Sequence, residues 1–209
     1  MAAPGTLITH DLSTARARPS RGLLVDFWRG CGRLFLAIGG WKIAGDWPAD
    51  PKCVIIAAPH TSNWDGIWMI AAAAAWRIRL RYMGKKSLTD GPFGGIVRWT
   101  GCIPIDRSKS NDVVAAMKLA FAAESGLILA VPPEGTRDAV QKWKSGFYHI
   151  AVGAGVPITF AVMDYATRTV SLPATLWPSG DYEADLAVIQ SFYTDAKGKY
   201  PANFVMTGK

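Results

Sequence analysis

The sequence predicts a single-domain α/β fold in which helices and strands form layers. Short apolar runs that are typical of buried strands alternate along the chain with longer segments of helical periodicity, and this alternation favours an α/β layer structure. The chain has 209 residues, which is enough for one domain with a hydrophobic core. Half of the residues are hydrophobic and 19% are charged, a composition that excludes an intrinsically disordered chain.

The N-terminal 40 residues are expected to form a tail and then a helix. Residues 1–20 are predicted to be a flexible tail, because proline, glycine and serine interrupt them. Residues 21–40 are predicted to be an amphipathic interfacial helix that stops at Gly39-Gly40. Its apolar residues recur at helical spacing: Leu23, Leu24, Phe27, Cys31, Leu34, Phe35 and Ile38.

Two environments are possible for this helix. Arginines beside an apolar face fit a helix that lies in a membrane interface. The alternative is a helix that packs on the domain and leaves its arginines in water. The flanking Trp28 and Trp41 favour the interface, because tryptophan suits the boundary between lipid and water.

Residues 41–209 carry the strands and helices of the domain. Residues 54–58 form a continuous apolar run, which indicates a buried strand. Residues 111–124 form an amphipathic helix, with Val113, Met117 and Phe121 among the residues that face inward. The predicted strands are 54–58, 80–83, 102–105, 127–131, 157–163 and 169–172, and the predicted helices after the first are 66–76, 111–124, 147–152 and 181 to about 196.

Charge, cysteine content and hydropathy narrow the classes of function. The net charge of +7 favours phosphate-bearing partners, whether nucleic acid, anionic lipid or a charged cofactor. No aromatic and basic recognition motif supports a nucleic-acid partner. The three cysteines are far apart and odd in number, which favours a reducing compartment over a disulfide framework or a metal site. We expect no transmembrane helix and no secretory signal, because no run of about 20 apolar residues occurs.

The first candidate site is the segment from Pro59 to Gly66. His60 follows a predicted buried strand, and Asp65 opens the next predicted helix. A turn between them would let the carboxylate orient the imidazole, and histidine is the natural general base near neutral pH. No serine or cysteine occupies a nucleophile elbow, so His60 would activate a hydroxyl of the substrate. Alternatively, Ser62 and Asp65 form only a helix-capping box.

The second candidate site is the loop Glu134-Gly135-Thr136-Arg137, directly after the predicted strand 127–131. Backbone N–H groups, the Thr136 hydroxyl and the Arg137 guanidinium can converge on an anion in such a loop. Glu134 can hold Arg137 or a substrate hydroxyl. A turn with a surface ion pair is the alternative.

Two further segments have the same position at strand ends. Residues 101–108 contain a short apolar run that ends in Arg107, and Lys85-Lys86 lie upstream of it. Residues 155–158 read as a helix stop followed by a strand start, so we expect them only to shape the pocket.

Together these four segments resemble the conserved blocks of the glycerolipid acyltransferase family. His60 and Asp65 match its His, four residues, Asp signature, and Glu134 to Arg137 match its third block in full. Residues 101–107 and 156–158 look like its second and fourth blocks. The resemblance covers about residues 40 to 165, and it implies a mixed central sheet flanked by helices, with residues 41–209 as the acyltransferase domain.

The resemblance also implies roles and partners. His60 would be the general base and Asp65 its orienting partner. Arg107 and Arg137 would hold the phosphate of the acceptor, and Glu134, Gly135 and Thr136 would shape that site. The family is an O-acyltransferase family with no metal or redox cofactor. Its reaction would move a fatty acyl group from acyl-CoA or acyl carrier protein to a lysophospholipid, such as 1-acyl-sn-glycerol-3-phosphate, giving phosphatidic acid.

The same resemblance implies a monotopic or peripheral enzyme on the cytoplasmic face of the inner membrane, in contact with lipid and not with nucleic acid. Two departures from the family pattern occur: Pro132 stands where phenylalanine is usual, and Asp138 where serine is common. An acidic residue at that place can weaken phosphate binding or signal another headgroup. Acylation of another lyso-lipid, such as an amino-acid lipid or a glycolipid, is therefore one alternative. A protein that binds membrane lipid without catalysis on the same fold is a separate alternative.

Overall fold

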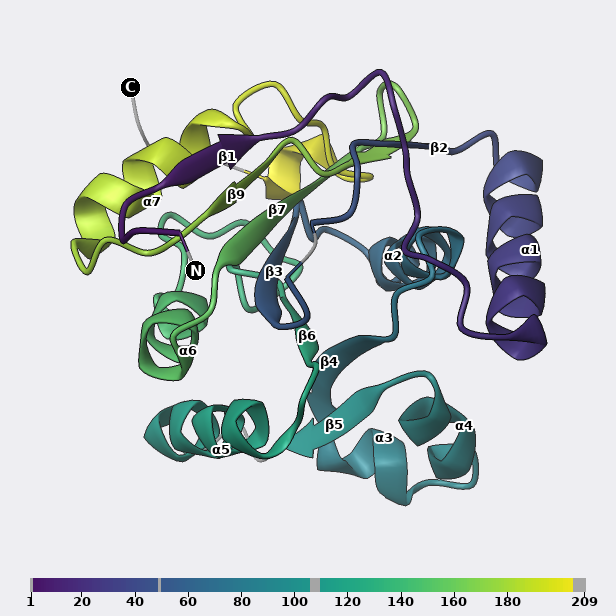
Figure 1. Ribbon diagram of the computed structural model, residues 1–209, viewed down its shortest axis with the longest axis horizontal. Helices are drawn as coiled ribbons and strands as arrows, with labels where there is room; N and C mark the ends of the chain where they lie inside the picture. Colours follow the sequence, from purple (N-terminus) through teal and green to yellow (C-terminus); the bar gives the residue numbers. More distant parts are fainter. Residues whose placement is uncertain (1, 49, 106–109, 205–209) are drawn as a thin grey trace.

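The computed structural model of the protein describes residues 2–48, 50–105 and 110–204. Over these residues the strands form one mixed sheet with helices on both faces (Figure 1). This arrangement confirms the predicted α/β layer fold. The described sheet has nine strands, with seven of them in the order β1-β9-β7-β3-β6-β4-β5, while β8 pairs with β7 and β2 pairs with β8.

The centre of the sheet is parallel and one side of it is antiparallel. β3 lies between β7 and β6, and β4 continues the parallel part from β6 to β5. On the other side, β8 and β9 run antiparallel to β7, and β1 runs antiparallel to β9. The strands are β1 (Leu7–Thr9), β2 (Lys42–Ala44), β3 (Cys53–Ala58), β4 (Leu80–Lys85), β5 (Cys102–Ile105), β6 (Ile128–Val131), β7 (Ile158–Asp164), β8 (Thr169–Ser171) and β9 (Ala174–Leu176).

The helices divide between the two faces of the sheet, with α1 and α2 on one face and α5, α6 and α7 on the other (Figure 1). The side chains of β3 alternate accordingly: Val54 and Ile56 face the second group, while Cys53 and Ile55 face the first. Both sets are fully buried, which explains why the strand reads as a continuous apolar run. The helices are α1 (Leu23–Ile38), α2 (Asn63–Ala75), α3 (Lys86–Asp90), α4 (Gly94–Trp99), α5 (Ser110–Ala123), α6 (Gly146–Ala154), α7 (Tyr182–Ser191) and the short 3₁₀ helix Pro201–Asn203.

The N-terminal segment differs from the expected flexible tail over 1–20. Its residues Leu7–Thr9 form β1 and pair with β9 at one edge of the sheet. Further along, the Arg18 backbone N–H donates to the Trp76 carbonyl. The prediction was wrong for this part because the pairing partner lies about 165 residues away in the chain, and local composition carries no signal for such a contact.

Helix α1 packs on α2 through a narrow strip. A Cβ atom at Gly32 would lie 2.6 Å from the Ala71 carbonyl oxygen, so glycine allows the two backbones to approach closely. Leu36 is also buried. The predicted apolar face points elsewhere, since Leu23, Leu24 and Ile38 are between 79% and 89% exposed. At about 100° per residue, the seven predicted apolar residues share an arc of about 120°, and at the edge of this arc Phe35 contacts Trp68 of α2 with ring centroids 5.0 Å apart.

A helix thus lies within the predicted range 21–40, and most of its apolar face has no protein partner within the described residues. None of the helices that the structure describes is long and apolar enough to cross a membrane.

Candidate active site

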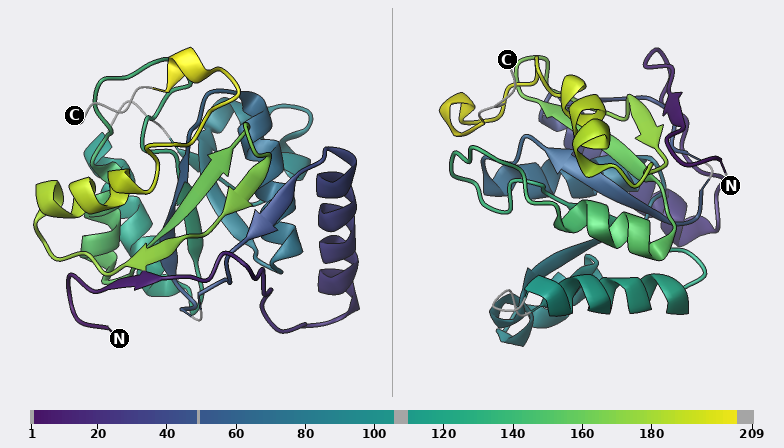
Figure 2. Two further views of the ribbon diagram at one scale, coloured as in Figure 1. Left: turned by 90° about the horizontal axis from the view of Figure 1, so that it is seen from above. Right: turned by 90° about the vertical axis from the view of Figure 1, so that its left-hand side faces the viewer.

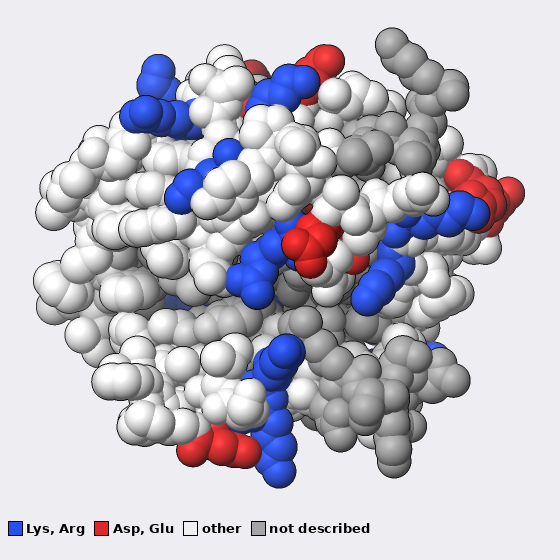
Figure 3. All heavy atoms as spheres, turned by 180° about the vertical axis from the view of Figure 1, so that it is seen from behind, with Lys and Arg blue, Asp and Glu red and all other residues white. Residues whose placement is uncertain are grey.

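The parallel strands end on one side of the molecule, and the candidate site residues gather there. β3 and β7 point to the same side in Figure 2, which is the side that faces the reader in Figure 3. Lys and Arg side chains lie on both sides of a hollow across the middle of this face (Figure 3). Ligands of α/β sheets usually bind at the carboxyl ends of the strands.

His60 and Asp65 meet across the turn between β3 and α2. The His60 Nδ1 atom lies 3.5 Å from Asp65 Oδ2, and the imidazole side chain is 26% exposed. Ser62 is the N-cap of α2 and forms a complete capping box with Asp65. Asp65 Oδ2 also accepts from the backbone N–H groups of Thr61 and Ser62 at 2.7 Å each. The two alternative roles of Asp65 are thus compatible: it caps the helix and faces the histidine.

A tyrosine completes this group. The Tyr165 hydroxyl, just beyond β7, donates to Asp65 Oδ1 at 2.6 Å. The other carboxylate oxygen, Oδ2, faces His60 and accepts from the backbone N–H groups of Thr61 and Ser62. Sequence reasoning missed Tyr165, which lies 100 residues from Asp65; its position directly after a predicted strand was the available signal.

The environment favours an ionised Asp65. Its side chain is buried, and burial alone would raise its pKa. Hydrogen bonds from His60, Tyr165 and the Ser62 backbone outweigh that effect and hold the pKa of Asp65 below its usual 3.8. A carboxylate in this state can orient the imidazole and stabilise its protonated form.

Glu134 links the two candidate segments. It follows β6, is only 2% exposed, and its Oε1 accepts from the His60 backbone N–H at 2.9 Å. Its Oε2 is buried and has no hydrogen-bond partner among the described residues. Burial raises the pKa of Glu134 to about 7. The alternative of a turn with a surface ion pair does not apply to Glu134, because its side chain is buried and accepts a hydrogen bond from the His60 backbone.

The rest of the loop lies beside the start of α2. The Arg137 guanidinium donates to Asn63 Oδ1, which places this cation next to the turn that carries His60. Gly135 has φ +68°, a conformation that glycine adopts without strain. Thr136 Oγ1 donates to Asp138 Oδ2 at 3.3 Å. The unusual Asp138 is therefore engaged by its own loop.

Lys144 is a second cation that sequence reasoning missed here. Its Nζ would lie 2.9 Å from a Cβ atom at Gly135, so its side chain crosses directly over the glycine. The Lys144 backbone N–H also donates to the Pro133 carbonyl at 2.8 Å. Nothing in its local sequence distinguishes it from an ordinary exposed lysine.

The remaining predicted residues divide as follows. Arg107 lies outside the described residues, so its place in the site stays a prediction. Gly155 ends α6 with a left-handed conformation and Ile158 opens β7, which agrees with the structural role expected for residues 155–158. Within the described residues, no group of three or more His, Cys, Asp or Glu side chains is placed to hold a metal ion.

Aromatic side chains cover the flank of the site that faces α1. Trp68 stacks between Trp41 and Trp64, with ring centroids 5.2 and 6.0 Å apart, and Trp41 meets Tyr165 edge-on at 4.8 Å. Lys199 lies over the Trp64 ring at 5.3 Å. A small pocket of about 300 Å³ lies among these rings, and both Tyr165 and Gly39, at the end of α1, line it.

Comparisons with known sequences agree with this geometry. Residues 46–163 match the family described as Acyltransferase. A 1-acyl-sn-glycerol-3-phosphate acyltransferase from Haemophilus influenzae is 31% identical over 172 residues, which are 78% of this chain and 68% of that protein. Proteins of the same name from Salmonella typhimurium and Escherichia coli K12 are 33% and 30% identical over 143 residues, which are 64% of this chain and 57% of each relative.

A solved structure has the same fold. The 1-acyl-sn-glycerophosphate (LPA) acyltransferase PlsC from Thermotoga maritima superimposes with a TM-score of 0.55 at 16% identity, over 81% of this chain and 76% of that one. At this identity the likeness concerns the fold alone. The family match extends over more than half of the sequence and includes both loops that meet at His60. The chain belongs to the acyltransferase family, as its resemblance to glycerolipid acyltransferases predicted.

Proposed function

We propose that this protein transfers a fatty acyl group from a thioester, acyl-CoA or acyl carrier protein, to the free hydroxyl of a lysophospholipid. The acceptor that fits best is 1-acyl-sn-glycerol-3-phosphate, the substrate in the names of the relatives. One observation carries the proposal: the His60–Asp65 pair and the cationic loop of Arg137 lie side by side, linked by hydrogen bonds from His60 to Glu134 and from Arg137 to Asn63.

In the proposed mechanism His60 is the general base. Asp65 faces Nδ1, so Nε2 is the nitrogen left for the substrate hydroxyl. Nε2 takes the hydroxyl proton as the oxygen attacks the thioester carbonyl carbon. The carbon–sulfur bond then breaks, and the leaving thiolate takes the proton from His60. General base catalysis of this kind typically contributes about 10²–10⁴-fold to the rate.

The acceptor phosphate is assigned to the cations beside the histidine. Arg137 offers a planar fork of donors, and Lys144 adds a second positive charge over Gly135. The sequence adds Arg107 to this set. Arg137→Ala should therefore raise the KM for a phosphate-bearing acceptor more than it lowers kcat, because phosphate binding precedes the chemical step.

We also propose that α1 lies flat in the membrane interface. Its exposed apolar arc continues onto α2 through Trp64 and Ile67, which are 45% and 42% exposed. An exposed apolar surface of this extent marks an interaction site, and an amphipathic helix with arginines beside the apolar face suits a lipid surface. Phe27→Gln with Ile38→Gln should therefore weaken binding to lipid vesicles while the free energy of unfolding in solution stays the same.

The direct test is an assay of the purified protein with acyl-CoA and lysophosphatidic acid. Thiol release and the appearance of phosphatidic acid by mass spectrometry would support the proposed reaction. Parallel assays with acyl carrier protein thioesters, and with lyso-lipids of other headgroups, separate the donor and acceptor alternatives. If thiol is released only with a lyso-lipid that carries no phosphate, the acceptor is an amino-acid lipid or a glycolipid. No transfer with any of these pairs would contradict the proposal.

A further inference from the structure

A second cavity lies at the amino ends of the parallel strands, opposite the ends that carry the candidate active site. It has a volume of about 690 Å³, and Leu80 and Ile128, the first residues of β4 and β6, contribute to its wall. Cys53, the register partner of Ile128, precedes His60 by seven residues. At about 3.3 Å per residue the two sites are therefore about 20 Å apart. The proposed acyl transfer does not use this cavity.

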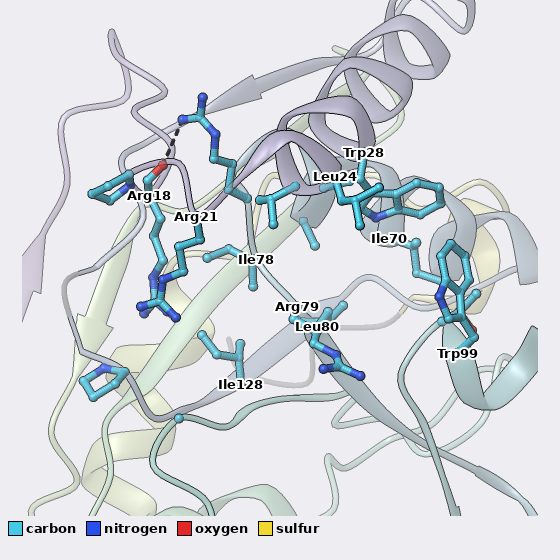
Figure 4. A pocket seen from close by; sticks show the side chains of 18 of the residues that line it. Arg18, Arg21, Leu24, Trp28, Ile70, Ile78, Arg79, Leu80, Trp99 and Ile128 are labelled. Atoms are coloured by element: carbon cyan, nitrogen blue, oxygen red, sulfur yellow. Dashed lines mark hydrogen bonds between the residues drawn. The ribbon is translucent and has the colours of Figure 1, made fainter.

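One end of the cavity is basic. Arg18 and Arg21 reach into it side by side, and Arg79 lies farther along the wall, beside Leu80 (Figure 4). Arg18 donates to the Asp50 carbonyl, and Arg77, also on the wall, pairs with Asp26 at 2.7 Å. Arg21 and Arg79 have no hydrogen-bond or carboxylate partner among the described residues, so they are available to an anion.

These cations also repel each other. Burial lowers the pKa of Arg18, and the positive charge of Arg21 lowers it further. An anion between the guanidinium groups would remove this repulsion. Phosphate is the preferred anion of such a cluster, because planar guanidinium groups donate to its oxygens in pairs.

The other end of the cavity is apolar and opens toward the exposed face of α1. Leu24 and Trp28 of α1, Ile70 of α2 and Trp99 of α4 lie together there (Figure 4). Trp28 and Trp99 meet edge to face with centroids 5.1 Å apart, although they are 40% and 65% exposed. Exposed tryptophans at the rim of an apolar surface are typical of contact with the lipid headgroup region.

Helix α4 extends this surface. Phe93 and Ile96, beside Trp99, are 71% and 62% exposed. The apolar arc of α1 therefore continues onto a second helix, with the basic cavity between them. Helix α1 is about 24 Å long, and it leads from this cavity at Leu24 to the small aromatic pocket at Gly39. If α1 lies flat on the bilayer, both ends meet lipid.

We propose that this cavity binds an anionic phospholipid of the membrane. Its phosphate lies at Arg18 and Arg21, Arg79 adds positive charge farther along the wall, and one acyl chain lies along Leu24, Trp28 and Trp99. The bound lipid is neither substrate nor product. It anchors the N-terminal end of α1, while the C-terminal end keeps the active site at the membrane. The inference rests on the proposed function only in requiring that α1 faces lipid.

The test compares vesicle binding of two variants with the same loss of charge. Arg21→Gln with Arg79→Gln removes the two unpartnered cavity cations. Arg16→Gln with Lys118→Gln removes two exposed positive charges outside the cavity. Binding is measured by cosedimentation with phosphatidylcholine vesicles and with the same vesicles containing phosphatidylglycerol, a lipid that is not an acyl acceptor in the proposed reaction.

We expect wild type to prefer the anionic vesicles. The cavity variant should partition to them about 30-fold less, which is the loss expected when two arginines near an anionic surface are removed. The control variant should lose less than about threefold. Binding to pure phosphatidylcholine should stay similar in all three proteins. Thermal unfolding checks the fold, which should be unaffected because neither cavity arginine has a partner to lose.

Two outcomes would overturn the inference. Equal losses in both variants would show a response to net charge alone, and an unchanged lipid preference in the cavity variant would show that the arginines do not bind the headgroup. Other results would contradict the proposed function instead. Wild type that binds no vesicle at all would contradict the interfacial placement of α1, and wild type that releases no thiol would contradict acyl transfer.

Discussion

Replacing Tyr165 with phenylalanine removes one hydroxyl from the proposed catalytic group. That hydroxyl donates to Asp65 Oδ1 at 2.6 Å, and the carboxylate is only 2% exposed. A hydrogen bond to a charged group typically contributes about 1.5–3 kcal/mol, and its loss leaves a buried acceptor unsatisfied. We therefore expect Tyr165→Phe to lower the free energy of unfolding by about 2 kcal/mol, which corresponds to roughly 4–8 °C in melting temperature for a protein of this length.

The same change should also slow the reaction, because Asp65 then holds His60 less firmly. We expect kcat to fall about tenfold, as for the loss of a group that orients a catalytic residue and does not itself react. The chain offers a matched control in Tyr148, whose hydroxyl donates to the buried Asp185 at 2.8 Å. Tyr148→Phe should lose similar stability and keep kcat. Equal activity losses in the two variants would refute a specific role for Tyr165.

Further predictions concern burial and packing. Because burial raises the pKa of Glu134 from 4.5 to about 7, the folded state retains its proton more strongly than the unfolded state. The contribution of the protonated carboxyl to stability is complete below pH 4.5 and is lost as the pH rises through 7. Urea titrations should therefore show the free energy of unfolding of wild type falling by up to about 3 kcal/mol relative to that of Glu134→Gln across that range. Parallel pH dependences of the two proteins would contradict this. Gly32→Ala should cost about 1–3 kcal/mol, because its Cβ would overlap the Ala71 carbonyl. Gly30→Ala, on the same helix with nothing within 4 Å, should stabilise by about 0.5–1 kcal/mol, and thermal melts that rank the pair the other way would exclude the close contact.

The sequence was sufficient for elements whose signal is local. The strand 102–105 is found as predicted, and 54–58 and 80–83 are found with one or two residues more. Helix 66–76 begins earlier, at Asn63, because Ser62 and Asp65 cap it. The last helix was predicted to about 196 but ends at Ser191, since residues beyond it turn back toward the site.

Elements that depend on distant partners could not be predicted. β1 and β2 have three residues each and exist only through pairing with β9 and β8. α3 and α4 have five and six residues, too few to show a helical period. Of these short elements, α4 contributes Trp99 to the wall of the basic cavity.

The candidate site likewise contains local contacts, which could be predicted from the sequence, and long-range contacts, which could not. His60 and Asp65 could be paired from the sequence because one turn joins them. The contact of Glu134 with the His60 backbone spans 74 residues, and that of Tyr165 with Asp65 spans 100. Only the order of the sheet brings β3, β6 and β7 side by side and so assembles these contacts.

The most direct test of the account is the rate of acyl transfer by His60→Ala. Alanine keeps the backbone N–H that donates to Glu134, and the lost imidazole is partly exposed, so the melting temperature should stay close to that of wild type. With acyl-CoA and lysophosphatidic acid, thiol release should fall by at least about 100-fold. A folded His60→Ala protein that retains most of its transferase activity would contradict the assignment of His60 as the general base.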